Sequence, residues 1–356
     1  MYEIRDGLKI AAGFAGVIIG AGFSSGQEIL QFFTNFGVIG IAGAVLCTCL
    51  FILLSREIAI SGFALKSASH QGMTQFFCGR RLGRVVDILL VITLFLVYTV
   101  MITGGGSLLN QYLGIPGLYG GLLIVLLTLV LTGLSVKHMI VAVGLLVPLS
   151  LLVVLIIWIY ALQNQTSDFS SLEAFALAQT NRSTNHWLIS AVLYVSYNLS
   201  SAAPILVIMG GQAQTQRAVV LGSILGSLLI GVLILLTTTA MYAQLGTIAI
   251  YPMPMLALAH LISPSLGTLM ALIIFGMILN SALACLYPLL MRFSSPGTIR
   301  FRVLAGAASL LGLTISSTQG FVPLVSFVYP LFGILGMLVI VAIFIKWVKT
   351  HLDQLR

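Results

Sequence analysis

Charged residues are scarce in this sequence, and cysteines are few. Charged residues make up 7% of the 356 residues, whereas hydrophobic residues make up 59% and the mean hydropathy is +1.14. These values exclude an ordinary soluble globular protein and are typical of a membrane protein with several spans. The 4 cysteines show no pairing or metal-ligand spacing, so we expect small packing residues rather than disulfides or a zinc site.

Motifs of enzymes and of nucleic-acid-binding proteins are also missing. The 5 histidines have no metal-ligand spacing, and the sequence contains no nucleophile–base set, Walker loop or dinucleotide fingerprint. The net charge of +8 comes from short basic clusters between apolar runs, without interleaved aromatics that could stack on bases. We therefore expect no enzymatic activity, no organic cofactor and no nucleic acid partner.

Apolar runs long enough to cross about 30 Å of hydrocarbon dominate the chain. They predict an all-α membrane protein with ten transmembrane helices in one transmembrane domain, residues 1–356. The runs are 8–36, 38–61, 85–110, 117–136, 138–162, 187–210, 217–243, 266–292, 300–317 and 320–348.

The basic residues predict the orientation of these spans. If the N-terminus is cytoplasmic, 15 of the 16 Lys and Arg residues fall on the inner side and only Arg182 faces outward. Basic residues concentrate in cytoplasmic loops, so we expect a multi-pass protein with both termini in the cytoplasm. The start of the chain, 1–9, mixes acidic and basic residues, unlike a cleaved leader, so the first run should remain as a span.

Ten spans divide into two sets of five. We expect repeat one at about 1–165 and repeat two at about 185–356, with an outer loop between them. Because each half has an odd number of spans, the second half enters the bilayer upside down relative to the first. The sequence thus predicts a 5+5 inverted repeat, which is typical of secondary transporters.

The first and sixth runs each contain a stretch that should not persist as a membrane helix. These stretches are Gly20-Ala21-Gly22-Phe23-Ser24-Ser25-Gly26 and Tyr197-Asn198-Leu199-Ser200-Ser201. Adding 178, half the chain length, to Gly22 gives Ser200, so the stretches correspond in the two halves. Unwound backbone at bilayer depth is tolerated only around a protected cavity, so we expect spans 1 and 6 to be broken at mid-membrane beside a binding site. The alternative for the first stretch is a glycine-rich helix that allows close packing.

Both stretches are followed by residues that can start a new helix. Ser25-Gly26-Gln27-Glu28 has the pattern of a capping box, and Ser200 or Ser201 can cap a second start with Pro204 in its first turn. The positive N-terminal ends of such half-helices can hold a carboxylate, and the carbonyl ends of the preceding half-helices suit a cation or an amine. A small zwitterion would satisfy both.

Glu28 is the only acidic side chain that we place within the hydrophobic part of a span. An unpaired carboxylate there costs about 3 kcal/mol or more, so it needs a partner or a function. One interpretation is the capping box itself. The other is a carboxylate that carries a coupling proton or binds the amine of a substrate, and the two are compatible.

The run Ile18-Ile19-Gly20-Ala21-Gly22 resembles the Gly-small-Gly turn of amino acid–polyamine–organocation transporters, which share the LeuT-like fold. The longer stretch 20–28 is similar to the YkvI-like membrane proteins of bacteria. This resemblance rests on a short motif and on the architecture of the whole chain. It implies the LeuT-like fold, a bacterial cytoplasmic membrane and secondary active transport.

The resemblance also implies sites for a coupling ion. LeuT-like proteins often hold sodium between carbonyls of span 1 and a span-8 site with adjacent hydroxyl side chains. Carried over by position, those residues are Gly16, Ile19, Met277, Asn280 and Ser281. Asn280 stands where a hydroxyl residue is usual, and Phe23 stands where a second sodium site has an asparagine, so we expect that second site to be absent.

Lys137 supports a competing interpretation. Gly133-Leu134-Ser135-Val136-Lys137 resembles the start of span 5 in relatives where a lysine amine replaces sodium and couples transport to protons. The alternative for Lys137 is a boundary lysine that extends to lipid headgroups. For Asn280 and Ser281, the alternative is a hydrogen bond between helices.

Side chains from two further places complete the expected solute site. Tyr98 lies where LeuT-like proteins place a tyrosine over the substrate; the alternative is an aromatic residue at the lipid interface. The second stretch supplies polar side chains. The expected substrate-binding residues are Ile19, Gly20, Ala21, Gly22, Phe23, Ser24, Tyr98, Ser196, Tyr197 and Asn198.

These features predict a transporter of a small amino acid or related amine or zwitterion, embedded in the lipid bilayer and driven by sodium or protons through alternating access. A second interpretation is a membrane receptor subunit, as in spore germinant receptors, which would use the same cavity for sensing. A channel is the third.

Overall fold

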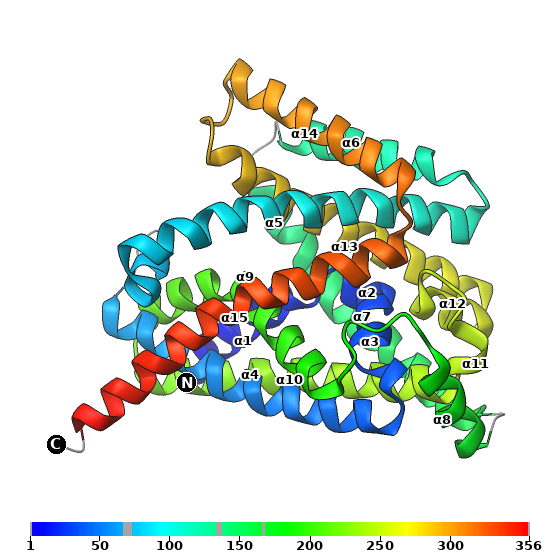
Figure 1. Ribbon diagram of the computed structural model, residues 1–356, viewed down its shortest axis with the longest axis horizontal. Coiled ribbons are helices and arrows are strands. Elements are labelled where there is room, and N and C mark those ends of the chain that lie inside the picture. The colour runs from blue at the N-terminus through cyan, green and yellow to red at the C-terminus, as the bar shows by residue number, and fades with distance from the viewer. Residues whose placement is uncertain (1, 67–72, 133–136, 166–167, 355–356) are drawn as a thin grey trace.

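The computed structural model describes residues 2–66, 73–132, 137–165 and 168–354, and the regular elements in these ranges are helices (Figure 1). In chain order they are α1 (Tyr2–Ile18), α2 (Ala21–Ser25), α3 (Gln27–Phe32), the 3-10 turn η1 (Thr34–Phe36), α4 (Val38–Leu65), α5 (Met73–Leu113), α6 (Gly117–Thr132), α7 (Lys137–Gln163), α8 (Phe169–Ala178), α9 (Trp187–Gln212), α10 (Gln216–Ala243), α11 (Leu245–Ile248), α12 (Pro254–Ile262), α13 (Pro264–Met291), α14 (Ile299–Thr318) and α15 (Phe321–Gln354). Long apolar runs form helices in hydrocarbon because the helix satisfies its own backbone groups there.

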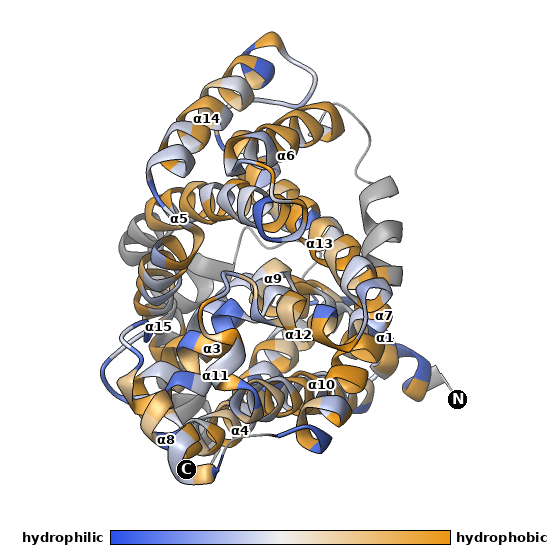
Figure 2. Cartoon of the chain, turned by 90° about the vertical axis from the view of Figure 1, so that its right-hand side faces the viewer, coloured by the Kyte–Doolittle hydropathy of each residue, from blue (hydrophilic) through white to orange (hydrophobic). Residues whose placement is uncertain are grey.

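Eight helices of the described chain are long and apolar enough to cross a membrane. They are α4, α5, α7, α9, α10, α13, α14 and α15. Their outer faces carry large apolar side chains, such as Leu53, Leu272 and Phe327, which are 60%, 63% and 64% exposed. Figure 2 shows hydrophobic residues along the outer surfaces of the helices. So much exposed apolar surface is typical of a chain surrounded by lipid, and the protein is therefore a multi-pass membrane protein.

The helices form two groups that meet at α9 and α15. In the first group, α5 contacts α6 and α14 on one side and α13 and α15 on the other (Figure 1). In the second group, α1 packs on α10, and α4 packs on both α9 and α10. Contact between α9 and α15 joins the groups. The short helices α2 and α3 lie inside this arrangement.

The prediction that the sixth span is broken at Tyr197–Ser201 is wrong. The helix α9 runs without interruption from Trp187 to Gln212. Four of its polar side chains bond to carbonyls one turn earlier in the same helix. These bonds run from Ser196 Oγ to Val192 O, Asn198 Nδ2 to Tyr194 O, Ser200 Oγ to Ser196 O and Ser201 Oγ to Tyr197 O, at 2.7, 2.9, 2.7 and 3.1 Å. Serine and asparagine can therefore stay inside a membrane helix, and Pro204 is accommodated within the same helix.

The connection between α7 and α9 forms hydrogen bonds with the ends of other helices. The carboxylate of Glu173, on α8, accepts the first N–H of α4 from Val38 and the hydroxyl of Tyr242, both at 2.9 Å. The guanidinium of Arg182 donates to the carbonyl of Asn35 at 2.8 Å and to that of Leu177 at 2.8 Å. The predicted outward-facing arginine thus caps helix ends that would otherwise leave their carbonyls unpaired.

Candidate functional site

The first predicted interruption corresponds to two changes of backbone direction. The helix α1 ends at Ile18, and Gly20 adopts an extended backbone with φ −103° and ψ −164°. After the single-turn α2, Gly26 adopts a left-handed φ of +83°, and α3 begins at Gln27. The chain therefore leaves helical geometry at Ile19–Gly20 and again at Gly26.

Two serines bond the polar backbone groups of the interruption. The hydroxyl of Ser281, on α13, accepts the N–H of Ala21 at 3.4 Å. The hydroxyl of Ser25 donates to the carbonyl of Gly22 at 2.9 Å and accepts the N–H of Gln27 at 3.3 Å. Burial without such partners would be costly, since hydrocarbon offers none.

The predicted capping box does not form. The residue that precedes α3 is Gly26, which has no side chain to cap the helix, and the Ser25 hydroxyl bonds the N–H of Gln27 rather than that of Glu28. Ser25 lies one position too early, because the left-handed Gly26 turns the chain between it and α3. The carboxylate of Glu28 therefore does not cap α3 and instead points toward another helix.

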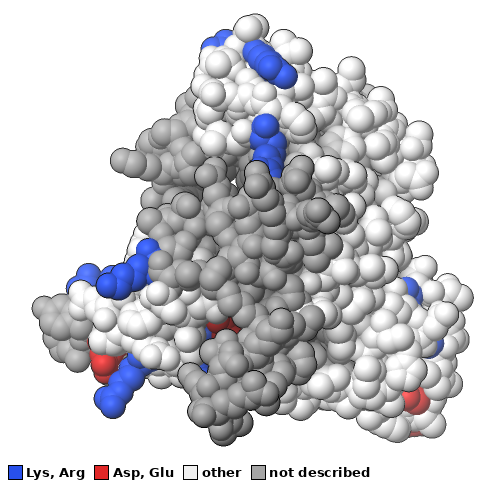
Figure 3. Space-filling model, turned by 60° about the vertical axis from the view of Figure 1, so that its left-hand side comes forward, with Lys and Arg blue, Asp and Glu red and all other residues white. Residues whose placement is uncertain are grey.

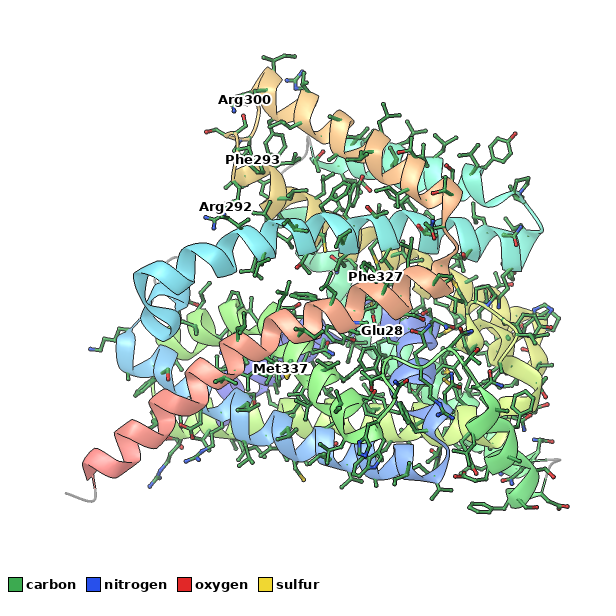
Figure 4. All side chains as sticks on the ribbon, in the orientation of Figure 1. Glu28, Arg292, Phe293, Arg300, Phe327 and Met337 are labelled. Carbon is green, nitrogen blue, oxygen red and sulfur yellow. The ribbon has the colours of Figure 1, made fainter. Side chains whose placement is uncertain are left out.

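Glu28 points into a cluster of tyrosines. Its side chain is 5% exposed, and its Oε2 atom accepts a hydrogen bond from the hydroxyl of Tyr197 on α9. The side chain of Tyr329, on α15, also lies close to this carboxyl group. The rings of Tyr197 and Tyr329 lie 5.2 Å apart between centroids, and those of Tyr194 and Tyr197 lie 5.3 Å apart. Figure 4 shows Glu28 beside α15, near α2 and α3.

The carboxyl group of Glu28 also lies directly against the interruption. A Cβ atom on Gly22 would overlap Glu28 Oε1, so the carboxyl occupies the space that a larger residue would fill. Within the described chain, no lysine, arginine or histidine forms an ion pair with Glu28. The structure therefore brings together Gly22, Glu28 and Tyr197 of the predicted site residues, and it adds Tyr329.

Position 26 requires glycine because of both its left-handed backbone angle and its close neighbours. A Cβ atom there would lie 2.7 Å from Met255 Cγ, on α12, which covers the junction of α2 and α3. We expect Gly26→Ala to destabilise the protein by about 1–2 kcal/mol from the left-handed angle alone, with a further loss from the contact. Thermal unfolding in detergent measures this, with Gly246→Ala as control because its Cβ would meet nothing within 4 Å. An unchanged melting temperature would contradict the expectation.

The residues of the predicted sodium site are only partly assembled. Ser281 lies at Gly20, where a Cβ atom would be 3.2 Å from Ser281 Oγ, and Met277 is fully buried on the same helix. Gly16 is partly exposed on α1, and its Cβ would meet nothing within 4 Å. The hydroxyl of Ser281 already accepts an N–H but keeps a second lone pair that suits a cation.

Ser281→Ala separates the two roles of this hydroxyl. Loss of the hydrogen bond to Ala21 should lower the free energy of unfolding by about 0.5–1.5 kcal/mol, with or without sodium. If the hydroxyl also binds sodium, the rise in melting temperature on adding sodium should disappear in the variant. Ser326→Ala is the control, since Ser326 bonds only to the carbonyl of Val322 in its own helix. An equal sodium effect in all three proteins would argue against Ser281 as a ligand.

The hydroxyl of Tyr98 bonds outside this cluster. Tyr98 is completely buried, so it is not at a lipid interface, and its hydroxyl pairs with Ser309 of α14 at 2.8 Å. The structure thus directs this hydroxyl into the contact between α5 and α14. Lys137 begins α7, but its side chain falls outside the described part of the structure.

Sequence reasoning missed a row of buried amides next to the interruption. Gln27, Gln31 and Asn35 are at most 1% exposed, and each has a side-chain oxygen without a hydrogen-bond partner. Gln27 and Asn35 border a cavity of about 220 Å³ that Tyr251 and Pro323 also line. Their spacing of four residues was visible in the sequence and could have indicated one polar helix face. For Tyr329, the sequence contains no comparable spacing that could have indicated its place in the site.

The chain is similar to two bacterial proteins over nearly its whole length. It is 28% identical to the membrane protein YkvI of Bacillus subtilis over 345 residues, which cover 95% of each chain. It is 27% identical to the protein YyaD of the same organism over 349 residues, covering 96% of this chain and 99% of YyaD. No family model matches the sequence.

Two solved structures show the same fold. The structure of MhsT in complex with L-phenylalanine matches with a TM-score of 0.60 and 16% identity, covering 93% of this chain and 87% of MhsT. The manganese transporter of Eremococcus coleocola matches with a TM-score of 0.53 and 16% identity, covering 96% and 77%. These likenesses show that the chain has the LeuT-like fold.

Proposed function

We propose that this protein is a secondary active transporter of a small amino acid or a related amine or zwitterion. One observation carries the proposal: a buried carboxyl group, Glu28, lies against an interrupted helix at Gly22 in a LeuT-like fold. A break in helical backbone and an ionisable side chain inside a membrane protein are features of solute sites. The match to MhsT, whose structure holds L-phenylalanine, supports an amino-acid-like solute.

The proposed architecture has ten spans in two inverted sets of five. The interrupted segment α1–α3 and the shorter apolar helix α6 would join the eight long helices, which makes 8 + 2 = 10. The packing supports the repeat: α1 contacts α10 as α9 contacts α4, and the central pairs are α4 with α10 and α5 with α13. If the repeat at about 1–165 were superposed on the repeat at about 185–356, the contact of α1 with α10 would become that of α9 with α4, and each central pair would map onto itself.

The proposed solute site centres on the backbone of 19–24. The solute carboxylate would bind backbone N–H groups there, and its amine would face Glu28 and Tyr197. Ser196 and Asn198 follow on the same helix, although their side chains bond within α9. Tyr98 would contribute through its ring. A coupling sodium would use Ile19, Ser281 and their predicted neighbours, and a coupling proton would use Glu28 or Lys137.

The charge distribution supports a cytoplasmic location for both termini in a bacterial cytoplasmic membrane. Basic residues occur where α1 begins, α4 ends, α10 begins and α13 ends, and these ends lie on one side of a chain that alternates direction. Figure 3 shows lysine and arginine side chains gathered on this side. Cytoplasmic loops of membrane proteins are enriched in these residues.

Uptake into proteoliposomes tests the proposal. The purified protein should accumulate at least one member of a panel of amino acids and primary amines when a sodium or proton gradient is imposed, and collapse of the gradient should stop accumulation. Absence of gradient-dependent uptake for the whole panel would refute transport. Binding without flux would instead favour the receptor.

A further inference from the structure

Four elements surround the carboxyl group of Glu28. Glu28 itself lies on α3, its Oε1 atom abuts Gly22 on α2, the hydroxyl of Tyr197 donates to it from α9, and Tyr329 lies close to it on α15. The tyrosine rings are in mutual contact, and both side chains are at most 4% exposed. The carboxyl is therefore held at the meeting point of the interruption and two spans.

The ionisable groups around this carboxyl are tyrosines. On α9 they are Tyr194 and Tyr197, and on α15 the group is Tyr329. The neighbouring helix α10 carries Arg217 at its first turn and Tyr242, whose hydroxyl bonds to Glu173 instead. The described residues of α2 and η1 carry no ionisable side chain.

A proton is the partner that this environment favours. An ionised carboxylate without a cation is strongly disfavoured inside hydrocarbon, and the hydrogen bond from Tyr197 offsets only part of that cost. A neutral carboxylic acid avoids it and can still accept the Tyr197 hydroxyl. A cation that arrived at Gly22 would reverse this preference, because the carboxylate would then have a charged partner.

We propose that Glu28 holds a proton in the packing seen here and exchanges it for the ammonium group of the solute, with Tyr197 and Tyr329 as positioning residues. The O–H bond of the carboxylic acid breaks, the proton leaves to water, and the carboxylate that remains pairs with the ammonium group. One positive charge replaces another, so the site stays neutral. This inference rests on the proposed transport function and names its coupling step.

Infrared difference spectroscopy of the lipid-reconstituted protein tests the first half without any solute. At neutral pH, the wild type should show the carbonyl band of a buried carboxylic acid, and Glu28→Gln should lack it. Glu173→Gln is the matched control, because Glu173 also accepts a tyrosine hydroxyl but lies away from the interruption. In Tyr329→Phe the band should persist and shift in frequency, since a polar hydroxyl close to the carboxyl is removed. A Glu28 that is ionised at neutral pH would overturn the inference.

Proton release on ligand addition tests the second half. Ethylamine and the standard amino acids are added to purified protein in weak buffer with a pH indicator. At least one should release close to one proton per protein from the wild type and from Glu173→Gln, and none from Glu28→Gln. Tyr329→Phe should still release the proton but with a displaced pH dependence, whereas a merely structural residue would leave that profile in place.

The two proposals fail in different ways. Gradient-driven uptake without proton release would overturn proton exchange at Glu28 and leave transport standing. The absence of both uptake and proton release would overturn both. A proton release that survives in Glu28→Gln would assign the exchange to another group and refute this inference.

Discussion

Gly22→Val should reduce solute uptake to the level of empty liposomes. The Cβ atom of valine would overlap Glu28 Oε1, and the carboxyl cannot move away without losing its hydrogen bond from Tyr197. Overpacking of this kind costs about 1–3 kcal/mol of folding free energy, and here it also displaces the group that we expect to face the solute. Uptake and thermal unfolding of the same preparations measure the two effects.

A second substitution separates the steric effect from the chemical one. Glu28→Ala in the Gly22→Val background removes the overlapping side chain, so we expect the melting temperature to recover while uptake stays absent. Such non-additivity is expected for residues in direct contact. If the double variant were no more stable than Gly22→Val alone, the close approach of Gly22 and Glu28 would not be the cause.

The sequence predicted what depends on local composition. Long apolar runs predicted the spanning helices, and the glycines at 20 and 26 indicated where the first span leaves helical geometry. Both follow from local properties of the chain. In hydrocarbon a segment must satisfy its own backbone hydrogen bonds and so becomes helical, and glycine tolerates backbone angles that other residues avoid. The buried position of Glu28 followed in the same way from its place within an apolar run.

The errors arose where a polar residue had more than one way to be satisfied. Ser200 and Ser201 suggested a helix start, but each hydroxyl also reaches the carbonyl one turn earlier, and packing selected that arrangement. The prediction of a capping box at Ser25 and Glu28 was wrong for a similar reason, since the carboxyl accepts a hydrogen bond from Tyr197 on another helix. Nothing in sequence spacing reveals that Tyr329, 301 positions after Glu28, shares its site.

Gly336→Val should separate α15 from α9 and weaken both stability and transport. A Cβ atom on Gly336 would overlap the carbonyl of Ser196 and approach the hydroxyl of Ser200. The clash involves helix backbone, which cannot rotate aside as a side chain can, so we expect a loss of about 1–3 kcal/mol in the free energy of unfolding. Thermal unfolding measures this loss, with Gly306→Val as control because its Cβ would meet nothing within 4 Å.

The same substitution tests whether the contact between α9 and α15 positions the tyrosines around Glu28. Gly336 lets α15 approach the 196–200 turn of α9 closely, and the rings of Tyr197 and Tyr329 meet in the same interface between the two helices. If that contact holds the tyrosines together, Gly336→Val should shift the infrared band of Glu28 in the same direction as Tyr329→Phe, although it lies at a different level of α15. An unchanged band in a destabilised variant would mean that the tyrosines and Glu28 are positioned by α3 and α9 alone.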